Sequence, residues 1–264
     1  MTPRSRNRSL LEKVLPPLTV VVVLAVWQLV VDWRGIAPIY LPAPSAIVVA
    51  LVKMTLDGTL PFDLVVTLLR IFVGFAVAAV VGVGIGVVMG MSQLVARVAD
   101  PWIMALYPLP KISLIPLLII WLGTGEAYKI VISAITAFFP IVISTYSGIR
   151  QVDRGLIKAA EDLGANRRQI QMKIVVPAAV PSIFSGLHLG MGVTIILVVA
   201  AEMIGGSGQG GMGYLLISAG QVMETEKVFA GLVVLAVIGA LVIKLQRWID
   251  GKVAPWVAQG TINH

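Results

Sequence analysis

The sequence predicts an all-α polytopic membrane protein with about six transmembrane helices. Of its 264 residues, 58% are hydrophobic and only 12% are charged, whereas a soluble domain carries about a quarter charged residues. The hydrophobic residues are gathered in six long runs separated by short polar stretches. Each run is long enough to cross the roughly 30 Å hydrocarbon layer of a bilayer as a helix.

The predicted spans are, in chain order, residues 16–33, 64–91, 100–122, 128–148, 182–204 and 228–248. The first follows a basic stretch, and a basic start before an apolar run is also the signature of a signal peptide. This run ends in Trp33-Arg34-Gly35, without a small-x-small cleavage site. We therefore expect an uncleaved first span.

Between the first and second spans, Pro42, Pro44 and Ser45 predict the start of a short amphipathic helix over 45–56. In the third span, Pro108 and Pro110 are close enough together to break the helix. Broken backbone at membrane depth is tolerated only inside the protein or along a wet cavity. The alternative is a kinked helix that serves packing alone.

Small residues recur at every fourth position in two spans: Gly74, Ala78, Gly82, Gly86 and Gly90 in the second, and Gly186, Gly190 and Thr194 in the fifth. This spacing favours close helix packing in lipid, with helix sliding as the alternative. The segment GQGGMG, 208–213, matches a dinucleotide-binding pattern but follows a membrane span instead of a strand. We expect flexible backbone there, followed by a short interfacial or re-entrant helix over 214–226.

The longest polar interruption, 150–177, predicts a helix–turn–helix knob. Asp153 is a suitable N-cap and Gly164 a suitable C-terminal turn residue for a first short helix. Leu156, Ala160 and Leu163 form an apolar stripe at helical spacing. Asn166 and Gln169 fit a capping box for a second helix, and Pro177 and Pro181 mark where the chain is expected to turn into the fifth span.

The distribution of positive charge predicts the orientation. If the N-terminus is cytoplasmic, 14 of the 20 Lys and Arg residues lie on the cytoplasmic side or at that end of a span: Arg4, Arg6, Arg8, Lys13, Arg97, Arg150, Arg154, Lys158, Arg167, Arg168, Lys173, Lys244, Arg247 and Lys252. The positive-inside rule favours this arrangement. It makes 1–15 a cytoplasmic basic tail, 150–177 a cytoplasmic loop and 251–264 a cytoplasmic tail of a single transmembrane domain, 1–264.

The polar loop also carries a family pattern. Ala159-Ala160, then Gly164, then Ile174-Val175-Val176-Pro177 resembles the EAA loop of ABC-importer permeases, with Lys158 in place of the usual Glu and Val176 in place of the usual Leu. The segments LPAPSA, LLRIFVGF, YPLPKISLIPLLIIWLGTGE and AEMIG resemble the sulfonate, taurine and nitrate permeases of that family. The resemblance covers about residues 41–250.

The resemblance implies that the loop is a coupling helix that docks on a cytoplasmic ATPase subunit. The residues that it assigns to coupling are Lys158, Ala159, Ala160, Glu161, Leu163, Gly164, Arg167 and Pro177. It also implies two ATPase subunits, an extracytoplasmic substrate-binding protein, a bacterial inner-membrane location and transport by alternating access. A homodimer is expected on two grounds, since the family is dimeric and the chain has no second six-span half.

The translocation path is expected to pass Pro108 and Pro110, together with charged residues placed within spans: Arg70, Lys111 and Glu202. Charges at such depth need a partner or water. One interpretation is that Arg70 and Glu202 pair structurally. The other is that Lys111, with Arg70, attracts an anionic substrate; the resembled subgroup suggests taurine, an alkanesulfonate or nitrate.

Several other classes of function are disfavoured. The chain has no Cys and two His, so no thiol chemistry and no metal site is expected. It has no G-x-x-x-x-G-K-[ST] loop and no evident catalytic constellation, so ATP and magnesium belong to the partner ATPase and this chain is expected to bind no cofactor and to be no enzyme. The positive charge is explained by topology, without nucleic acid. The alternative function is an ion-gradient-driven carrier or channel, with an intramembrane enzyme as a third class.

Overall fold

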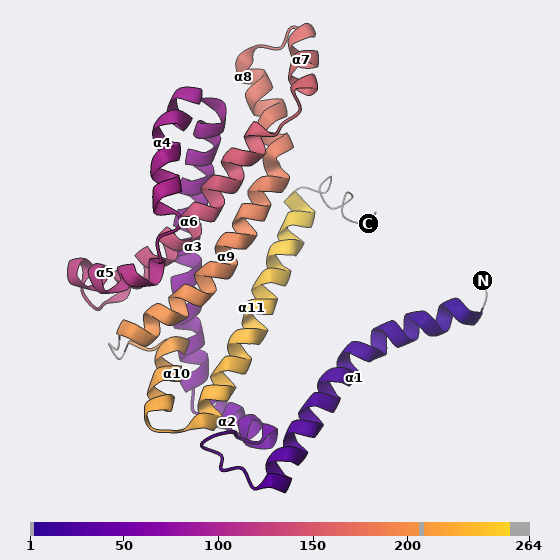
Figure 1. Ribbon diagram of the computed structural model, residues 1–264, viewed down its shortest axis with the longest axis vertical. Coiled ribbons are helices and arrows are strands. Elements are labelled where there is room, and N and C mark those ends of the chain that lie inside the picture. The colour runs from indigo at the N-terminus through magenta and orange to yellow at the C-terminus, as the bar shows by residue number, and fades with distance from the viewer. Residues whose placement is uncertain (1–2, 206–208, 254–264) are drawn as a thin grey trace. The chain divides into compact units, whose positions relative to one another are not determined.

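The computed structural model describes residues 3–205 and 209–253, with side chains from Leu15 onward, and every regular element in these ranges is helical. The elements are α1 (Pro3–Arg34), α2 (Pro44–Leu56), α3 (Thr59–Met91), α4 (Gln93–Leu106), a 3-10 helix (Lys111–Leu114), α5 (Ile115–Leu122), α6 (Glu126–Arg150), α7 (Arg154–Asp162), α8 (Arg167–Ile170), a π-helix (Gln171–Val175), α9 (Val176–Gly205), α10 (Met212–Gln221) and α11 (Thr225–Val253) (Figure 1).

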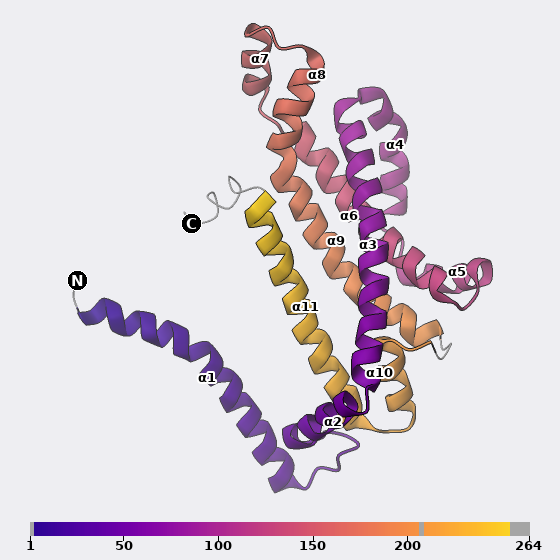
Figure 2. The same cartoon turned by 180° about the vertical axis from the view of Figure 1, so that it is seen from behind.

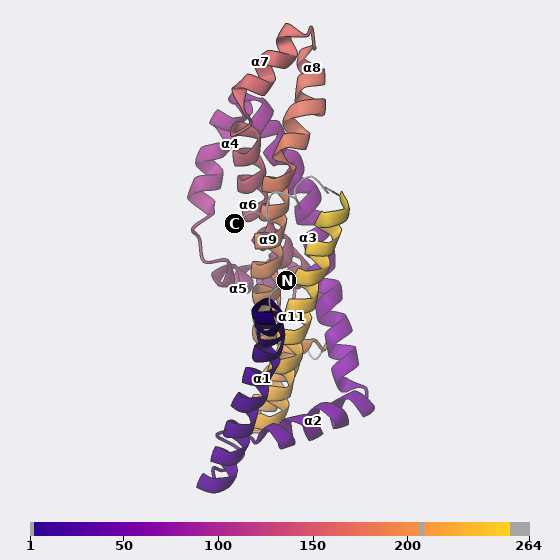
Figure 3. The same cartoon turned by 90° about the vertical axis from the view of Figure 1, so that its right-hand side faces the viewer.

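The number of membrane-spanning helices agrees with the prediction. Five helices in the described ranges are long and apolar enough to cross a bilayer, in segments 15–34, 59–91, 126–150, 167–205 and 225–252. A sixth span is formed if α4 and the segment 111–122 count together, and these two are bent by 89° at the break between them. Figure 3 shows α4 and α5 running in different directions. The break contains Pro108 and Pro110, as the sequence predicts.

The described chain divides into two compact units. One contains residues up to 61 together with 215–234, and the other contains 62–214 together with 235–253. In the first unit, Trp27 of α1 lies 5.8 Å, centroid to centroid, from Phe229 of α11. There the Gln28 Oε1 atom accepts a hydrogen bond from the Ser45 amide near the start of α2. The helix expected at 45–56 is present as α2 (Pro44–Leu56).

In the second unit α3, α6 and α9 pack against one another, and Figure 2 shows these three helices side by side. The small-residue stripes are the reason for this packing. A Cβ atom added at Gly82 or Gly90 of α3 would meet Ile141 or Ile149 of α6, and one added at Gly186 of α9 would meet Ser144 of α6. The stripes therefore serve close helix packing, as expected.

The expected turn at Pro177 and Pro181 is wrong. α8, the π-helix and α9 form one continuous rod from Arg167 to Gly205, and Pro181 lies inside α9. Pro177 has no N–H to give to the preceding turn, and the π-helical turn Gln171–Val175 ends two residues before it. The wider turn, placed where a regular hydrogen bond is missing, lets the helix continue.

Candidate functional site

The polar loop at one end of the α6–α9 pair folds as the sequence predicts. α7 begins after Asp153, whose carboxylate accepts a hydrogen bond of 2.7 Å from the Gly155 amide. It ends before Gly164, which has φ +81°, a conformation that suits glycine and costs other residues about 1 kcal/mol or more. The predicted capping box is present, because the Asn166 side chain accepts from the Gln169 amide and the Gln169 side chain accepts from the Asn166 amide.

The apolar stripe of this loop divides into a buried and an exposed part. Ala160 is buried and packs with Ile149 of α6 and Ile170 of α8. Leu156 and Leu163 are 52% and 89% exposed. The loop is thus fixed to the helix pair on one side and presents leucines on the other. Of the remaining predicted coupling residues, Lys158, Ala159, Glu161, Gly164 and Arg167 are exposed and Pro177 is partly buried.

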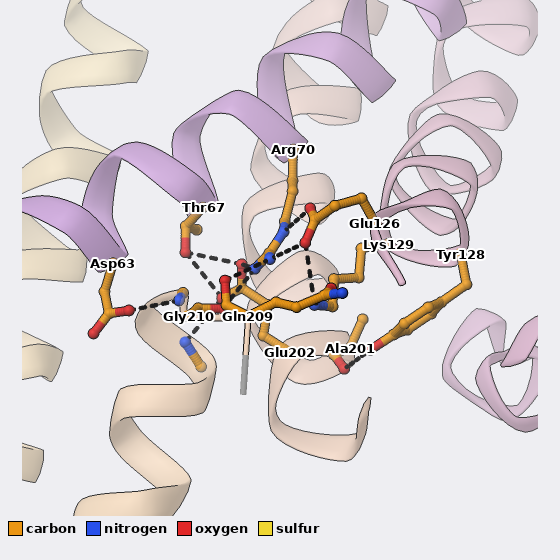
Figure 4. Close-up of polar contacts among 12 residues, drawn as sticks. Asp63, Thr67, Arg70, Glu126, Tyr128, Lys129, Ala201, Glu202, Gln209 and Gly210 are labelled. Carbon is orange, nitrogen blue, oxygen red and sulfur yellow. Dashed lines mark hydrogen bonds and ion pairs between the residues drawn. The ribbon is translucent and has the colours of Figure 1, made fainter. Parts of the chain in front are cut away.

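The opposite end of the same helix pair holds a buried ion cluster, drawn in Figure 4. At its centre is Arg70 of α3, whose side chain is 1% exposed. Its Nη1 donates to Glu202 Oε1 at 2.6 Å and to the Gly210 carbonyl at 2.9 Å. Its Nε and Nη2 donate to the two carboxylate oxygens of Glu126 at 2.6 and 2.5 Å, and Nη2 also reaches the Gln209 carbonyl at 3.4 Å. All five N–H donors of the guanidinium are therefore used.

The same cluster caps the N-terminus of α10. The amide of Gly211 donates to Asp63 of α3 at 2.7 Å, that of Met212 to Thr67 Oγ1 at 2.8 Å, and that of Gly213 to Glu202 at 2.9 Å. The first amides of a helix have no partner within the helix. Here side chains from two other helices supply those partners, which joins α3, α9 and the start of α10.

A second buried cation adjoins the cluster. The Lys129 side chain is 3% exposed, and its Nζ lies 3.6 Å from Glu126 Oε1 and 3.5 Å from Gln209 Oε1. The two carboxylates that face the cations differ in exposure: Glu202 is 0% exposed and Glu126 is 47% exposed. Two cations thus face two carboxylates, one carboxylate sealed inside and the other at the surface.

The glycine-rich loop is pressed against this cluster. Gly211 has φ +118°, and a Cβ atom there would lie 2.5 Å from Arg70 Nη1; a Cβ atom at Gly210 would lie 2.5 Å from the Phe62 ring. Gly210, Gly211 and Gly213 are buried. The expectation of flexible backbone is wrong for residues 209–213, because their glycines allow close contact with buried side chains. Residues 206–208 of the loop lie outside the described residues.

The predicted path residues do not gather at one place. Arg70 and Glu202 are paired, in agreement with the structural interpretation of these two charges. Lys111 lies elsewhere: its Nζ donates to the Tyr107 carbonyl at the end of α4 and lies 5.1 Å and 4.7 Å from the ring centroids of Tyr107 and Phe139. Pro108 and Pro110 belong to that same break. A role of these residues in the translocation path stays a prediction.

Sequence reasoning missed four members of the ion cluster: Asp63, Thr67, Glu126 and Lys129. Asp63, Thr67 and Arg70 are spaced i, i+4, i+7, which places them on one face of a helix. That polar stripe at the start of an apolar run was an available signal. Glu126 lies 56 residues from Arg70, and nothing local connects them.

The comparisons with known proteins identify the family. Residues 81–255 match the family model described as binding-protein-dependent transport system inner membrane component. The chain is 34% identical over 243 residues to the taurine transport system permease protein TauC of Escherichia coli, which covers 90% of this chain and 88% of that protein. It is 35% identical to the putative aliphatic sulfonates transport permease SsuC of Bacillus subtilis, with 89% and 84% covered, and 30% identical to the nitrate import permease NrtB of Synechocystis, with 91% and 89% covered.

The fold has a solved counterpart. A chain of the inward-facing MetNI methionine ABC transporter superimposes with a TM-score of 0.61 at 22% identity, covering 77% of this chain and 98% of that chain. Within the described residues no group of three His, Asp or Glu side chains is placed to hold a metal ion. The family consists of transport subunits without catalytic or cofactor chemistry of their own, which rules out the intramembrane enzyme and the stand-alone, gradient-driven carrier or channel.

The family model, the relatives and the solved counterpart agree with the helical, multi-pass fold. The chain belongs to the binding-protein-dependent transport system inner membrane components, as the multi-pass permease subunit of an ABC importer that works with ATPase and binding-protein partners.

Proposed function

We propose that this chain forms, as a homodimer, the membrane path of an importer for a small organic or inorganic oxyanion of the taurine, alkanesulfonate or nitrate kind. The observation that carries the proposal is the agreement among the relatives: the taurine, sulfonate and nitrate permeases match along nearly their whole length at 30–35% identity.

The loop 150–177 is the proposed contact with the ATPase, and the excess of positive charge at that end supports a cytoplasmic location for it and for both termini. On this orientation the ion cluster faces the binding protein. The two sites are joined by α6, whose 25 residues span about 38 Å at 1.5 Å per residue. ATP binding closes the ATPase subunits, the loop moves with them, and the helices tilt between inward-facing and outward-facing arrangements.

The test is uptake by proteoliposomes that contain this chain, its ATPase subunit and its binding protein. We expect ATP-dependent uptake of labelled taurine, methanesulfonate or nitrate. Gly164→Asp is expected to abolish uptake while the protein still inserts, because a residue with a Cβ is strained at φ +81° and the new carboxylate lies in the proposed contact. Gly251→Asp, at another exposed glycine, is the control. Full uptake by the Gly164 variant would contradict the coupling role, and failure to import any of the three anions would contradict the substrate class.

A further inference from the structure

The geometry points to Glu126 as an internal stand-in for the transported anion: its carboxylate occupies an oxyanion site built from Arg70 and Lys129, and a sulfonate or nitrate replaces it there. This inference rests on the proposed anion transport and deepens it by naming a binding site. The argument begins from the two carboxylates that share one guanidinium.

Glu202 and Glu126 bind different edges of Arg70 and are held differently. Glu202 takes Nη1, is fully buried, and also accepts hydrogen bonds from Thr67 and from the Gly213 amide. Glu126 takes the Nε–Nη2 edge and, among the described residues, contacts only Arg70 and Lys129. Glu202 is therefore a fixed part of the cluster. The half-exposed Glu126 carboxylate can move away by breaking only its contacts with Arg70 and Lys129 among the described residues (Figure 4).

The position of Glu126 in the chain favours such an exchange. It is the first residue of α6 and follows Gly125, which is the N-cap in extended conformation, and Gly123, which has φ +77°. The side chain is 47% exposed, so a rotation about its own bonds carries the carboxylate into solvent while α6 stays in place. Arg70 and Lys129 cannot follow it, since both are almost fully buried.

Departure of Glu126 leaves a site that selects anions. Arg70 and Lys129 carry two positive charges, against the negative charges of Glu202 and of Asp63, which also lies in the cluster. Departure of Glu126 therefore raises the net charge of the cluster from −1 to zero and frees one edge of the guanidinium. The free Nε–Nη2 edge presents two parallel N–H donors, which match two oxygens of a carboxylate, sulfonate or nitrate in the same way. The Lys129 ammonium, which lies 3.6 Å from one Glu126 oxygen, is placed to contact the anion as well. A buried cation pair binds anions more strongly than an exposed one because water screens it less.

The test compares binding of methanesulfonate with binding of methanesulfonamide, a neutral molecule of similar shape. The protein is the detergent-purified complex with its ATPase, without nucleotide or binding protein, and binding is measured by calorimetry. Glu126→Gln is expected to tighten methanesulfonate binding at least about tenfold, because an internal competitor that fills the site nine-tenths of the time lowers apparent affinity by that factor. Binding of methanesulfonamide is expected to stay unchanged.

Two further variants test whether the anion replaces the Glu126 carboxylate or responds only to the net charge of the site. Glu126→Asp keeps the negative charge but is one methylene too short to reach both nitrogens, so it is expected to tighten methanesulfonate binding by several-fold. Lys129→Met is expected to weaken that binding in both the wild-type and the Glu126→Gln backgrounds. Glu224→Gln removes a glutamate of similar exposure, 41%, from the ion pair with Lys227, and is expected to change nothing. Each variant is checked for a monodisperse complex and a single cooperative melting transition.

The inference is overturned if Glu126→Gln binds methanesulfonate no more tightly than the wild type, if Glu126→Asp behaves as the wild type, or if the sulfonamide follows the sulfonate. Its failure is distinct from failure of the proposed function. If the wild type imports an anion but the Glu126 variants bind methanesulfonate as the wild type does, only the exchange of Glu126 for the anion is contradicted. If those variants bind methanesulfonate more tightly but no anion is imported, the proposed transport is contradicted and the anion-binding site is supported.

Discussion

The two ends of the α6–α9 helix pair hold their polar residues in opposite ways. At the loop end, each side-chain hydrogen bond that caps α7 and α8 joins residues two or three positions apart, and the charged side chains are exposed. At the other end, the bonds of Arg70 reach across 56 to 140 residues and are buried or partly buried. The shape of the loop end is therefore determined by residues that are close in sequence, and its charged side chains form an exposed surface. The cluster end instead holds together four segments that are far apart in sequence.

This difference predicts how each end responds to mutation. A buried charge that loses its partner destabilises the whole unit, because its desolvation is no longer compensated. Substitution of an exposed loop residue is expected to affect only the binding of the protein that contacts it. Substitutions at the cluster should therefore change stability, and substitutions on the loop surface should change assembly.

The largest effect is expected at Arg70. Arg70→Met leaves the fully buried Glu202 without its cation, at a cost of about 3–5 kcal/mol, measured as the loss of unfolding free energy of the detergent-purified protein. Arg70→Met combined with Glu202→Gln should lose less than the single variant, since the stranded charge is removed. Equal losses in the single and double variants would show that the pair is not coupled.

A smaller effect is expected where the glycine loop meets the cluster. Gly211→Ala forces a side chain into φ +118° and toward Arg70 Nη1, which we expect to cost about 1–3 kcal/mol and to lower the melting temperature. Gly220→Ala is the matched control, because a Cβ atom there meets nothing within 4 Å. A Gly211 variant as stable as the control would mean that the loop is not held in this conformation.

On the loop surface the effect should appear in assembly instead of stability. Leu163→Ala removes a leucine that is 89% exposed; the free energy of unfolding should stay within about 0.5 kcal/mol of the wild type. Affinity for the ATPase subunit should fall by about tenfold or more, as for an apolar anchor at an interface. Leu94→Ala, at another exposed leucine (74%), tests whether the loss is specific to the loop, measured by co-purification and titration.

The smallest effect is expected from the capping box. Asn166→Ala removes the side chain that accepts from the Gln169 amide, at a cost of about 1 kcal/mol, whereas Asn166→Asp keeps an acceptor. Faster hydrogen exchange confined to the amides of α8 would report this change. Faster exchange at the ion cluster as well would contradict the separation of the two ends.

The same difference decides what could be predicted from the sequence. The cap at Asp153, the turn at Gly164 and the box at Asn166 follow from residues a few positions apart, and all three are present. The partners of Arg70 could not be found this way, because Glu126 and Glu202 become its neighbours only when α3, α6 and α9 pack. Only the pairing with Glu202 was among the interpretations, since both are rare charges within apolar runs. The turn at Pro177 was mispredicted because a proline marks a missing hydrogen bond without saying whether the helix ends or widens there.

The π-helical turn between α8 and α9 sets the direction in which the loop faces. A π turn contains one residue more than a regular turn, and each helical residue adds a rotation of about 100°. The five residues Gln171–Val175 therefore fix the angle between the exposed face of α8 and the glycine face of α9 that packs on α6. Deleting one residue from this turn would keep the rod continuous and point its loop-end tip toward a different neighbour, so the length of this short segment determines the angle at which the loop meets its partner.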